Sequence, residues 1–324
     1  MKQPVMIIAY FSEKYFMKKA GLFVFCLIIY SLISQNSFAQ YKTDTKLEKQ
    51  LKPLLDSFHG TVGIYVRNLK TGKEVAINAD SIFPTASIVK VPILIGVFNK
   101  IEQGAFTFHS PLLYRDSMAH GGSGLMQYFK DSTKTDLKTA VSLMLAHSDN
   151  TAAIWCEKLA GGGITINSWL ADHGFVYTRL NARTAGREPE NKEYGWGQTT
   201  PREMADLMVM IREGKAVSKA SSEIMYRQLT KAFWDEYALS QIPPYVQVAS
   251  KQGMVNDSRS EALLVNAPHG DYVFYIATKN NKDQRWVPEN EAWQLARDVS
   301  SLLWNYFEPH YGWKPAQGVE KFMH

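Results

Sequence analysis

Three short strings place a serine, a lysine and an amide in an order suited to covalent hydrolysis. Ser87-Ile88-Val89-Lys90 is followed along the chain by Ser148-Asp149-Asn150 and then by Lys251-Gln252-Gly253. Side chains three residues apart share one face of a helix, so the Lys90 amine is expected within hydrogen-bond reach of the Ser87 hydroxyl. A neutral amine there accepts the hydroxyl proton and activates the oxygen for attack. The set predicts a serine hydrolase whose base is a lysine.

Each string on its own is weak, and the prediction depends on the ordered set. Ser-x-x-Lys and Lys-x-Gly each arise about once by chance in a chain of this length and average composition. Taken singly, Ser87 would be a helix cap, Ser148 to Asn150 a turn, and Lys251 a solvated lysine on an edge strand. Lys70-Thr71-Gly72 also matches Lys-x-Gly, but it precedes the serine and separates two strand-like runs. It therefore predicts a hairpin turn.

The composition is that of a globular protein and agrees with a soluble exported enzyme. With 324 residues, 45% hydrophobic and 21% charged, the chain can bury a large core as one or two domains. The net charge of +5 is mild and the basic residues are scattered, so we expect no nucleic-acid partner. The eight histidines form no metal-binding pair and no cysteine ligands support them, so we expect no metal and no cofactor. We also expect a monomer.

The first 39 residues have the three regions of a secretory signal peptide. Lys18-Lys19 precede an apolar run from Ala20 to Ile33, and Ser37-Phe38-Ala39 supplies the small residues of a cleavage site after Ala39. An uncleaved membrane anchor is the alternative, but the apolar run is shorter than the roughly 20 residues that a span needs. We expect an exported protein, periplasmic or secreted, with no stable membrane anchor. Its single remaining cysteine, Cys156, is expected to be a buried small hydrophobe.

The mature chain shows strand patterns at both ends and helix patterns between them. The most economical arrangement is one antiparallel sheet covered by the first and last helices, with a second, all-helical lobe. We therefore expect a fold of the α/β (α+β) class, with a sheet lobe over about 40–86 and 215–324, a helical lobe over about 87–214, and the site in the cleft between them. The expected strands are Thr61 to Leu69, Glu74 to Asn78, Val246 to Ser250, Glu261 to Asn266 and Tyr272 to Thr278.

With these strings and this arrangement, the chain resembles class A β-lactamases and the wider serine hydrolase family built like them. The resemblance covers roughly Thr45 to Phe307 and includes three further stretches: Gly122-Ser123-Gly124, Thr178-Arg179-Leu180 and Thr199-Thr200-Pro201. It implies the same fold, that of β-lactamases and penicillin-binding proteins, in which a sheet flanked by N- and C-terminal helices faces an all-α lobe.

The resemblance also implies a role for each matching residue. Ser87 corresponds to the nucleophile, and Lys90 to the base or proton relay beside it. Ser148 corresponds to the hydroxyl that passes a proton to the departing nitrogen. On the substrate-binding side, the family implies that Asn150 grips a side-chain carbonyl, that Lys251, Gln252 and Gly253 receive the substrate carboxylate, and that the backbone N–H groups of Ser87 and Met254 form the oxyanion hole.

The sequence departs from the family in the carboxylate site. Gln252 stands where the family has threonine, and a longer amide side chain alters how a carboxylate would be held. Arg259, in Asp257-Ser258-Arg259-Ser260, is expected either to supplement this site or to be an exposed strand arginine.

A second departure lies between Leu180 and Pro201. Lactamases of the family carry a glutamate there that activates the deacylating water, in the context Glu-Pro-Glu-Leu-Asn. Here the chain offers Glu188-Pro189-Glu190-Asn191 later in the loop, and an alignment without gaps places Thr184 at the catalytic position. We expect Glu188 to be the base, with Glu190 and Glu193 as the next candidates; the alternative is that all three are surface carboxylates.

Three functions remain open at this point. A β-lactamase hydrolyses its acyl-enzyme, whereas a penicillin-binding DD-carboxypeptidase, or another amide or ester hydrolase acting on cell-wall peptides, is trapped by a β-lactam. The aspartate in Ser148-Asp149-Asn150 and the single compact domain favour the β-lactamase. A non-catalytic binder of cell-wall peptides is disfavoured by the intact serine and lysines.

Overall fold

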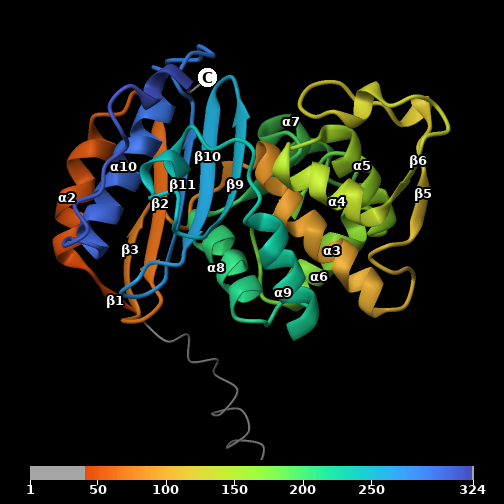
Figure 1. Cartoon of the computed structure of the whole chain (residues 1–324), viewed down its shortest axis with the longest axis horizontal. Coiled ribbons are helices and arrows are strands. Elements are labelled where there is room, and N and C mark those ends of the chain that lie inside the picture. Colours follow the sequence, from red (N-terminus) through yellow and green to blue (C-terminus); the bar gives the residue numbers. More distant parts are fainter. Residues whose placement is uncertain (1–40, 323–324) are drawn as a thin grey trace, which may run out of the picture. The chain divides into compact units, whose positions relative to one another are not determined.

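A six-stranded sheet built from both ends of the chain forms the centre of the structure (Figure 1). The computed structural model describes residues 41–322, so the predicted signal peptide lies outside the described residues. Neighbouring strands are antiparallel except for the parallel β1–β3 pair, which confirms the expected sheet. In spatial order the strands are β1 (Lys42–Thr43), β3 (Lys73–Ile77), β2 (Thr61–Asn68), β11 (Tyr272–Lys279), β10 (Ser258–Val265) and β9 (Val248–Val255).

Two details of the strands bear on the sequence predictions. Lys70-Thr71-Gly72 forms the β2–β3 turn, where the Gly72 N–H donates to the Asn68 carbonyl at 2.9 Å, which confirms the hairpin. Strand β9 runs past Ser250, where the prediction ended it, as far as Val255. It continues because Lys251 and its neighbours pair with β10 residue by residue. The polar residue types in this stretch do not predict a strand, so the sequence did not reveal the continuation.

Helices α2 (Thr45–Asp56) and α10 (Glu291–Phe307) cover one face of the sheet (Figure 1). Leucines at positions 47, 51 and 55 form the buried stripe of α2, as their helical spacing predicts. Asp44 caps α2 by accepting a hydrogen bond from the Leu47 N–H, and Asn290 caps α10 in the same way through Ala292. The expected first and last helices are therefore confirmed.

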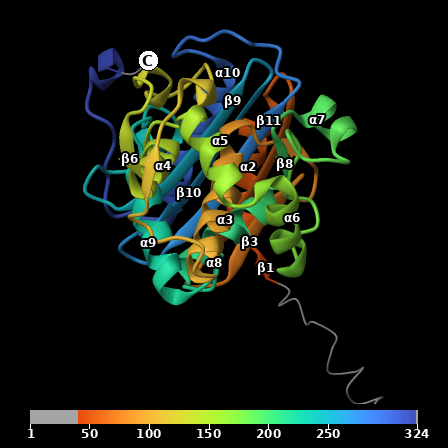
Figure 2. The same cartoon turned by 90° about the vertical axis from the view of Figure 1, so that its right-hand side faces the viewer.

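The other face of the sheet is covered by α8 (Pro201–Arg212), which packs on β2, β10 and β11. This helix falls within the stretch assigned to the helical lobe, yet it belongs to the sheet side. Beyond it a group of helices surrounds the apolar α3, in front of the sheet in Figure 2. The group contains α3 (Lys90–Glu102), α4 (Leu137–Ala146), α5 (Asn150–Leu159), α6 (Gly162–Asp172) and α9 (Lys219–Leu229).

Shorter elements complete the described chain. They are α7 (Glu188–Tyr194), the strands β4 (Phe83–Pro84), β5 (Pro111–Leu113), β6 (Lys134–Asp136), β7 (Arg179–Leu180) and β8 (Gly197–Thr199), and the 3-10 turns η1 (Ala86–Val89), η2 (Asp116–Met118), η3 (Met126–Tyr128), η4 (Ala238–Gln241) and η5 (Val319–Phe322). Over residues 41–322, no helix combines the length and apolarity needed to cross a membrane. Cys156 on α5 is free and fully buried, as predicted.

Candidate active site

Ser87 lies in the 3-10 turn η1, which runs directly into α3. Strand β9 passes closely against this turn. A Cβ atom on Gly253 would lie only 2.3 Å from the Thr85 carbonyl oxygen. Only glycine permits this approach. The last string is thereby brought against the first, and the backbone of Met254 reaches the neighbourhood of the nucleophile.

The Lys90 amine is the central contact of the site. Its Nζ atom donates to the Ser87 Oγ at 2.9 Å, to the Ser148 carbonyl at 2.6 Å and to the Asn150 Oδ1 at 2.9 Å. The side chain has no exposed surface, and burial together with the nearby Lys251 charge lowers the pKa of Lys90 well below its usual value. A depressed pKa supplies the neutral amine that a base requires.

Ser148 joins the two lysines. Its Oγ atom lies 3.1 Å from the Lys90 Nζ and 3.0 Å from the Lys251 Nζ. The residue adopts a left-handed backbone with φ of 53°, a strained conformation for a non-glycine residue. The adjacent Asp149 stabilises this turn by accepting from three backbone N–H groups, of Ala152, Leu125 and Met126.

Lys251 is also fully buried, and burial lowers its pKa to about 7, although the nearby Glu261 partly opposes the shift. Its Nζ donates to the Ser148 Oγ, to the Gln252 carbonyl at 3.0 Å and to the Gln252 Oε1 at 3.4 Å. The predicted edge-strand position is correct, since β9 ends the sheet, but the lysine is not solvated.

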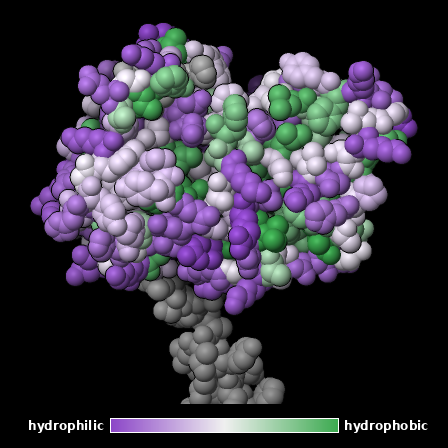
Figure 3. Space-filling model, in the orientation of Figure 1, coloured by the Kyte–Doolittle hydropathy of each residue, from purple (hydrophilic) through white to green (hydrophobic). Residues whose placement is uncertain are grey.

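A cavity of about 940 Å³ opens over these groups. Ser87, Ser148 and Asn150 reach its surface, and most of the remaining wall is apolar. None of the described residues that line it is acidic. Figure 3 shows hydrophobic side chains gathered around the indented upper edge, between strands and helices. The other lining residues are Gly122, Ser123, Gly124, Leu125, His147, Phe233, Trp234, Tyr237, Gln252, Met254, Trp286 and Trp293.

The structure does not bring Glu188 to this cavity. Glu188 begins the exposed helix α7, and its Oε1 accepts a hydrogen bond from the Gly186 N–H at 3.2 Å. Glu190 pairs with Arg187 at 3.3 Å, and Glu193 is exposed. Thr184, at the position given by an alignment without gaps, is buried against Gly163, where an added Cβ would lie 1.8 Å from the threonine Oγ1.

Arg259 is buried rather than exposed, so the alternative of an exposed strand arginine is wrong. Its guanidinium lies 4.6 Å from the Trp286 ring centroid and 5.2 Å from that of Trp293. Only Nη1 donates a hydrogen bond, to the Ser258 carbonyl, while Nε and Nη2 have no partner among the described residues. Burial lowers the pKa of the group.

Sequence reasoning missed Trp196, whose ring centroid lies 5.3 Å from the Lys90 Nζ. The indole Nε1 donates to Glu157 at 3.2 Å, and Arg183 donates to the same carboxylate oxygen at 2.6 Å. This aromatic face would favour a protonated Lys90, and it therefore acts against burial and the Lys251 charge, which lower the pKa of Lys90. The only signal in the sequence was a lone tryptophan between two glycines in a polar loop. Phe233 and Trp234, which lie in a loop and line the cavity, were missed in the same way.

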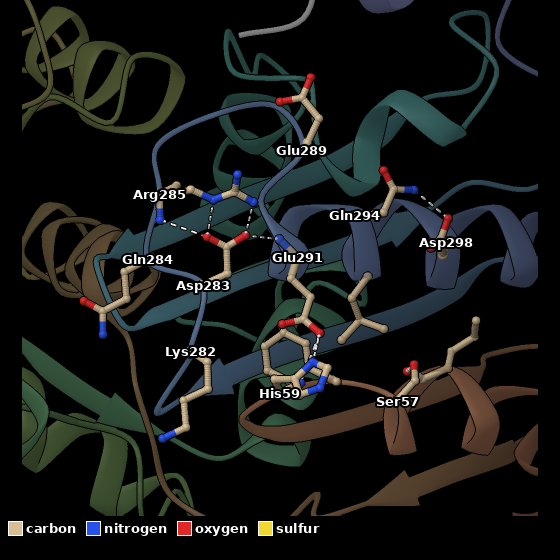
Figure 4. Close-up of a pocket in the computed structure, with 13 residues that line it drawn as sticks. Ser57, His59, Lys282, Asp283, Gln284, Arg285, Glu289, Glu291, Gln294 and Asp298 are labelled. Atoms are coloured by element: carbon tan, nitrogen blue, oxygen red, sulfur yellow. Dashed lines mark hydrogen bonds and ion pairs between the residues drawn. The ribbon is translucent and has the colours of Figure 1, made fainter.

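A second cavity of about 760 Å³ lies where α2, α10 and the loop before α10 meet (Figure 4). Its charged side chains largely pair with each other, as Asp283 does with Arg285 and His59 with Glu291, both at 2.8 Å. No residue of the three strings lines it. The chemistry that the three strings predict therefore belongs to the cavity over Ser87 and not to this one.

A buried lysine beside a serine, in a cleft between a sheet and a helical group, is the arrangement of a serine hydrolase. The model of the beta-lactamase enzyme family matches residues 46–307, and the chain belongs to that family. It is a β-lactamase-like serine hydrolase.

Known proteins agree with this assignment. The chain is 22% identical over 295 residues to the β-lactamase VEB-1 of Pseudomonas aeruginosa, covering 87% of this chain and 96% of VEB-1. The structure of PBP-A matches with a TM-score of 0.73 and 26% identity over 83% of this chain and 98% of PBP-A. A mutant of PBP-A that matches equally well is an acyl-enzyme complex with penicillin G. The β-lactamase of Sphaerobacter thermophilus matches with a TM-score of 0.72 and 24% identity, over 82% and 98% of the two chains.

Proposed function

We propose that this protein is an exported hydrolase that opens the β-lactam amide through an acyl-enzyme on Ser87, which water then hydrolyses. The observation that supports the proposal most strongly is the 2.9 Å contact between the buried Lys90 amine and the Ser87 hydroxyl. The export part of the proposal depends on the signal-peptide pattern. N-terminal sequencing of the exported protein tests it; a first residue of Gln40 supports the pattern, and a retained leader contradicts it.

The contacts support a simple proton path for acylation. The Ser87 Oγ attacks the carbonyl carbon while its proton passes to the neutral Lys90 Nζ. The C–N bond then breaks, the nitrogen takes the Ser148 hydroxyl proton, and Ser148 recovers a proton from Lys90, 3.1 Å away. Backbone N–H groups of Ser87 and Met254 would stabilise the oxyanion. No proton is gained or lost by the enzyme over these steps.

Deacylation is the slower half in this proposal. Hydrolysis of the ester needs a base for water, and the described lining of the cavity contains no carboxylate. A positioned base contributes about 10²–10⁴ in rate. Without a carboxylate to activate the water, the acyl-enzyme is expected to accumulate. The neutral Lys90 is then the nearest base to the ester.

The same observation favours a second candidate, a penicillin-binding DD-carboxypeptidase. A peptidase of this kind forms its acyl-enzyme on the same serine from a peptide, and a β-lactam traps it by acylating that serine. The likeness to PBP-A adds to this candidate.

Parallel assays separate the two functions. The protein is given penicillin G in one assay and an acetylated peptide ending in D-Ala-D-Ala in the other, and penicilloate and free D-alanine are measured. The hydrolase predicts repeated turnover of penicillin and no D-alanine. The peptidase predicts D-alanine release that one equivalent of penicillin abolishes. Ser87→Ala is the control for both assays.

A further inference from the structure

A loop residue, Trp196, presents an aromatic ring to the amine of Lys90. The ring centroid lies 5.3 Å from the Lys90 Nζ, within the distance at which an aromatic face attracts a cation. The next residue, Gly197, packs on the turn that carries Ser87. A Cβ atom on Gly197 would lie 2.9 Å from the Thr85 Oγ1, and its carbonyl accepts from the Thr85 N–H at 2.9 Å. The backbone next to the ring is therefore fixed beside the nucleophile.

A buried ion pair holds the indole itself. Glu157 on α5 is 3% exposed, and its Oε2 accepts from the Trp196 Nε1 at 3.2 Å and from the Arg183 Nη2 at 2.6 Å. The Arg183 guanidinium also lies 4.9 Å from the centroid of the same ring, but its charge is paired with Glu157. Helix α5 begins with Asn150, whose Oδ1 lies 2.9 Å from the Lys90 Nζ. The same helix therefore contacts both the indole and the lysine.

The charged groups that act on Lys90 can be named. Lys251 on β9 disfavours a cation there, and Asp149, in the turn before α5, favours one. Glu157 and Arg183 contact the indole and balance each other's charge. The oxygens within hydrogen-bond distance of the amine are neutral and belong to Ser87, Ser148 and Asn150. The Trp196 ring is therefore a distinct source of stabilisation for an ammonium at this position.

The acylation step creates such an ammonium. When the Ser87 Oγ attacks the carbonyl carbon, its proton passes to the Lys90 Nζ, which changes from a neutral amine to a cation. Lys90 has no exposed surface, so water cannot solvate the new charge. A contact that is stronger with the ammonium than with the amine lowers the barrier of this step. An aromatic face has this property, because its quadrupole attracts a cation.

We propose that Trp196 is a positioning residue for the acylation of Ser87, whose ring, held by Glu157, stabilises the ammonium that forms on Lys90. The proposal deepens the proposed function and rests on acylation of Ser87. It also gives a role to the loop in which lactamases of the family carry a glutamate. In this chain the loop acts on the base of acylation through an aromatic ring.

Fluorinated tryptophans at position 196 test the proposal, because fluorine withdraws electron density from the ring face and changes its shape little. The analogues are 5-fluoro-, 5,7-difluoro- and 4,5,6,7-tetrafluorotryptophan. Stopped-flow measurements with nitrocefin give the rate constant for acylation of Ser87 at each pH. The same analogues at Trp313, which is half-buried and outside the cavity over Ser87, are the matched control.

A weaker cation site lowers the pKa of Lys90, so the pH at which the acylation rate rises should fall with each added fluorine. The expected total shift is about one pH unit. Above that pH the rate constant should decrease in the same order, because Lys90 is a weaker base. Fluorination at Trp313 should change neither quantity. A rise that stays at the same pH, or moves to higher pH, overturns the proposal.

Trp196→Phe is the second variant, and it serves if the tetrafluoro protein does not fold. Phenylalanine attracts a cation less strongly than tryptophan and cannot donate to Glu157, so the rise should again move to lower pH. Disruption of the structure alone would hydrate Lys90 and move the rise to higher pH, because burial is the main cause of its low pKa. The direction of the shift therefore separates the proposed role from a merely structural one.

Failure of the two proposals is distinguishable. If intact-protein mass spectrometry finds no adduct on Ser87 of the wild type, both proposals are wrong. If Ser87 is acylated and the rise in rate does not respond to fluorination at position 196, only the role of Trp196 is wrong.

Discussion

The amine of Lys90 lies 2.9 Å from the hydroxyl oxygen of Ser87 and has no exposed surface. A charged amine in that position would lose its hydration without a contacting carboxylate to replace it. The resulting low pKa of Lys90 comes first from burial and second from Lys251. The packing of α3 against the Ser148 turn therefore both buries Lys90, which favours the neutral base, and holds it beside the Ser87 nucleophile.

Replacing Lys90 should affect chemistry more than binding. In Lys90→Ala, acylation of Ser87 is expected to slow by about 10²–10⁴, because the proton acceptor is lost. Stopped-flow acylation by a chromogenic β-lactam measures the rate constant and the apparent dissociation constant separately. Lys100→Ala, on the same helix and half-buried at its far end, is the matched control. Similar rates in the two variants would exclude Lys90 as the base.

Removing the charge of Lys251 should shift the pH dependence of acylation. That charge disfavours protonation of Lys90, so Lys251→Ala raises the pKa of Lys90. Acylation requires neutral Lys90, so the pH at which the acylation rate rises should move to a higher value. The pH profile of the acylation rate shows the shift, with the exposed Lys73→Ala on β3 as control. A rise that stays at the same pH, or moves to lower pH, contradicts the effect of the Lys251 charge on the pKa of Lys90.

Glu188→Gln should leave the lifetime of the acyl-enzyme within about twofold of wild type, because the carboxylate lies on an exposed helix and outside the cavity. Decay of the penicillin adduct by mass spectrometry measures the lifetime. Glu193→Gln on the same helix is the control. A lifetime longer by about 10² or more would show that Glu188 reaches the ester and is the general base that the sequence predicted.

Asp149→Ala should be strongly destabilising. Its fully buried carboxylate accepts three backbone N–H groups, so we expect a loss of about 3 kcal/mol or more in the free energy of unfolding. Asp136→Ala, which removes an N-cap with one such bond, should lose about 1 kcal/mol. Urea denaturation compares the two, and equal losses would contradict the importance of the Asp149 contacts.

The three strings could be found from the sequence because the spacing of their residues determines which side chains lie close together. A spacing of three aligns Ser87 and Lys90 on successive turns, and Ser148 precedes a helix whose cap is Asp149. The sheet was predictable because β-branched and aromatic runs lie at both ends of the chain. The continuation of β9 was not, since Lys251 and Gln252 are buried by tertiary contacts that contradict their polarity.

In the loop from Leu180 to Pro201, the positions of the side chains could not be predicted from the sequence. It has no periodic pattern, so the spacing of Glu188 from Leu180 does not determine where its carboxylate lies. Trp196 reaches Lys90 instead, through a contact that no local rule predicts. The cover of Arg259 by Trp286 likewise joins residues from separate loops and strands, and only the fold reveals it.

The most direct test of the account is intact-protein mass spectrometry of the wild type and Ser87→Ala after mixing with penicillin G. The account predicts that the wild type gains the mass of one penicillin, that peptide mapping after digestion places it on the peptide with Ser87, that this adduct decays slowly to free enzyme, and that Ser87→Ala gains nothing. A wild type that never carries the adduct and releases no penicilloate, or an adduct that persists in Ser87→Ala, would contradict it.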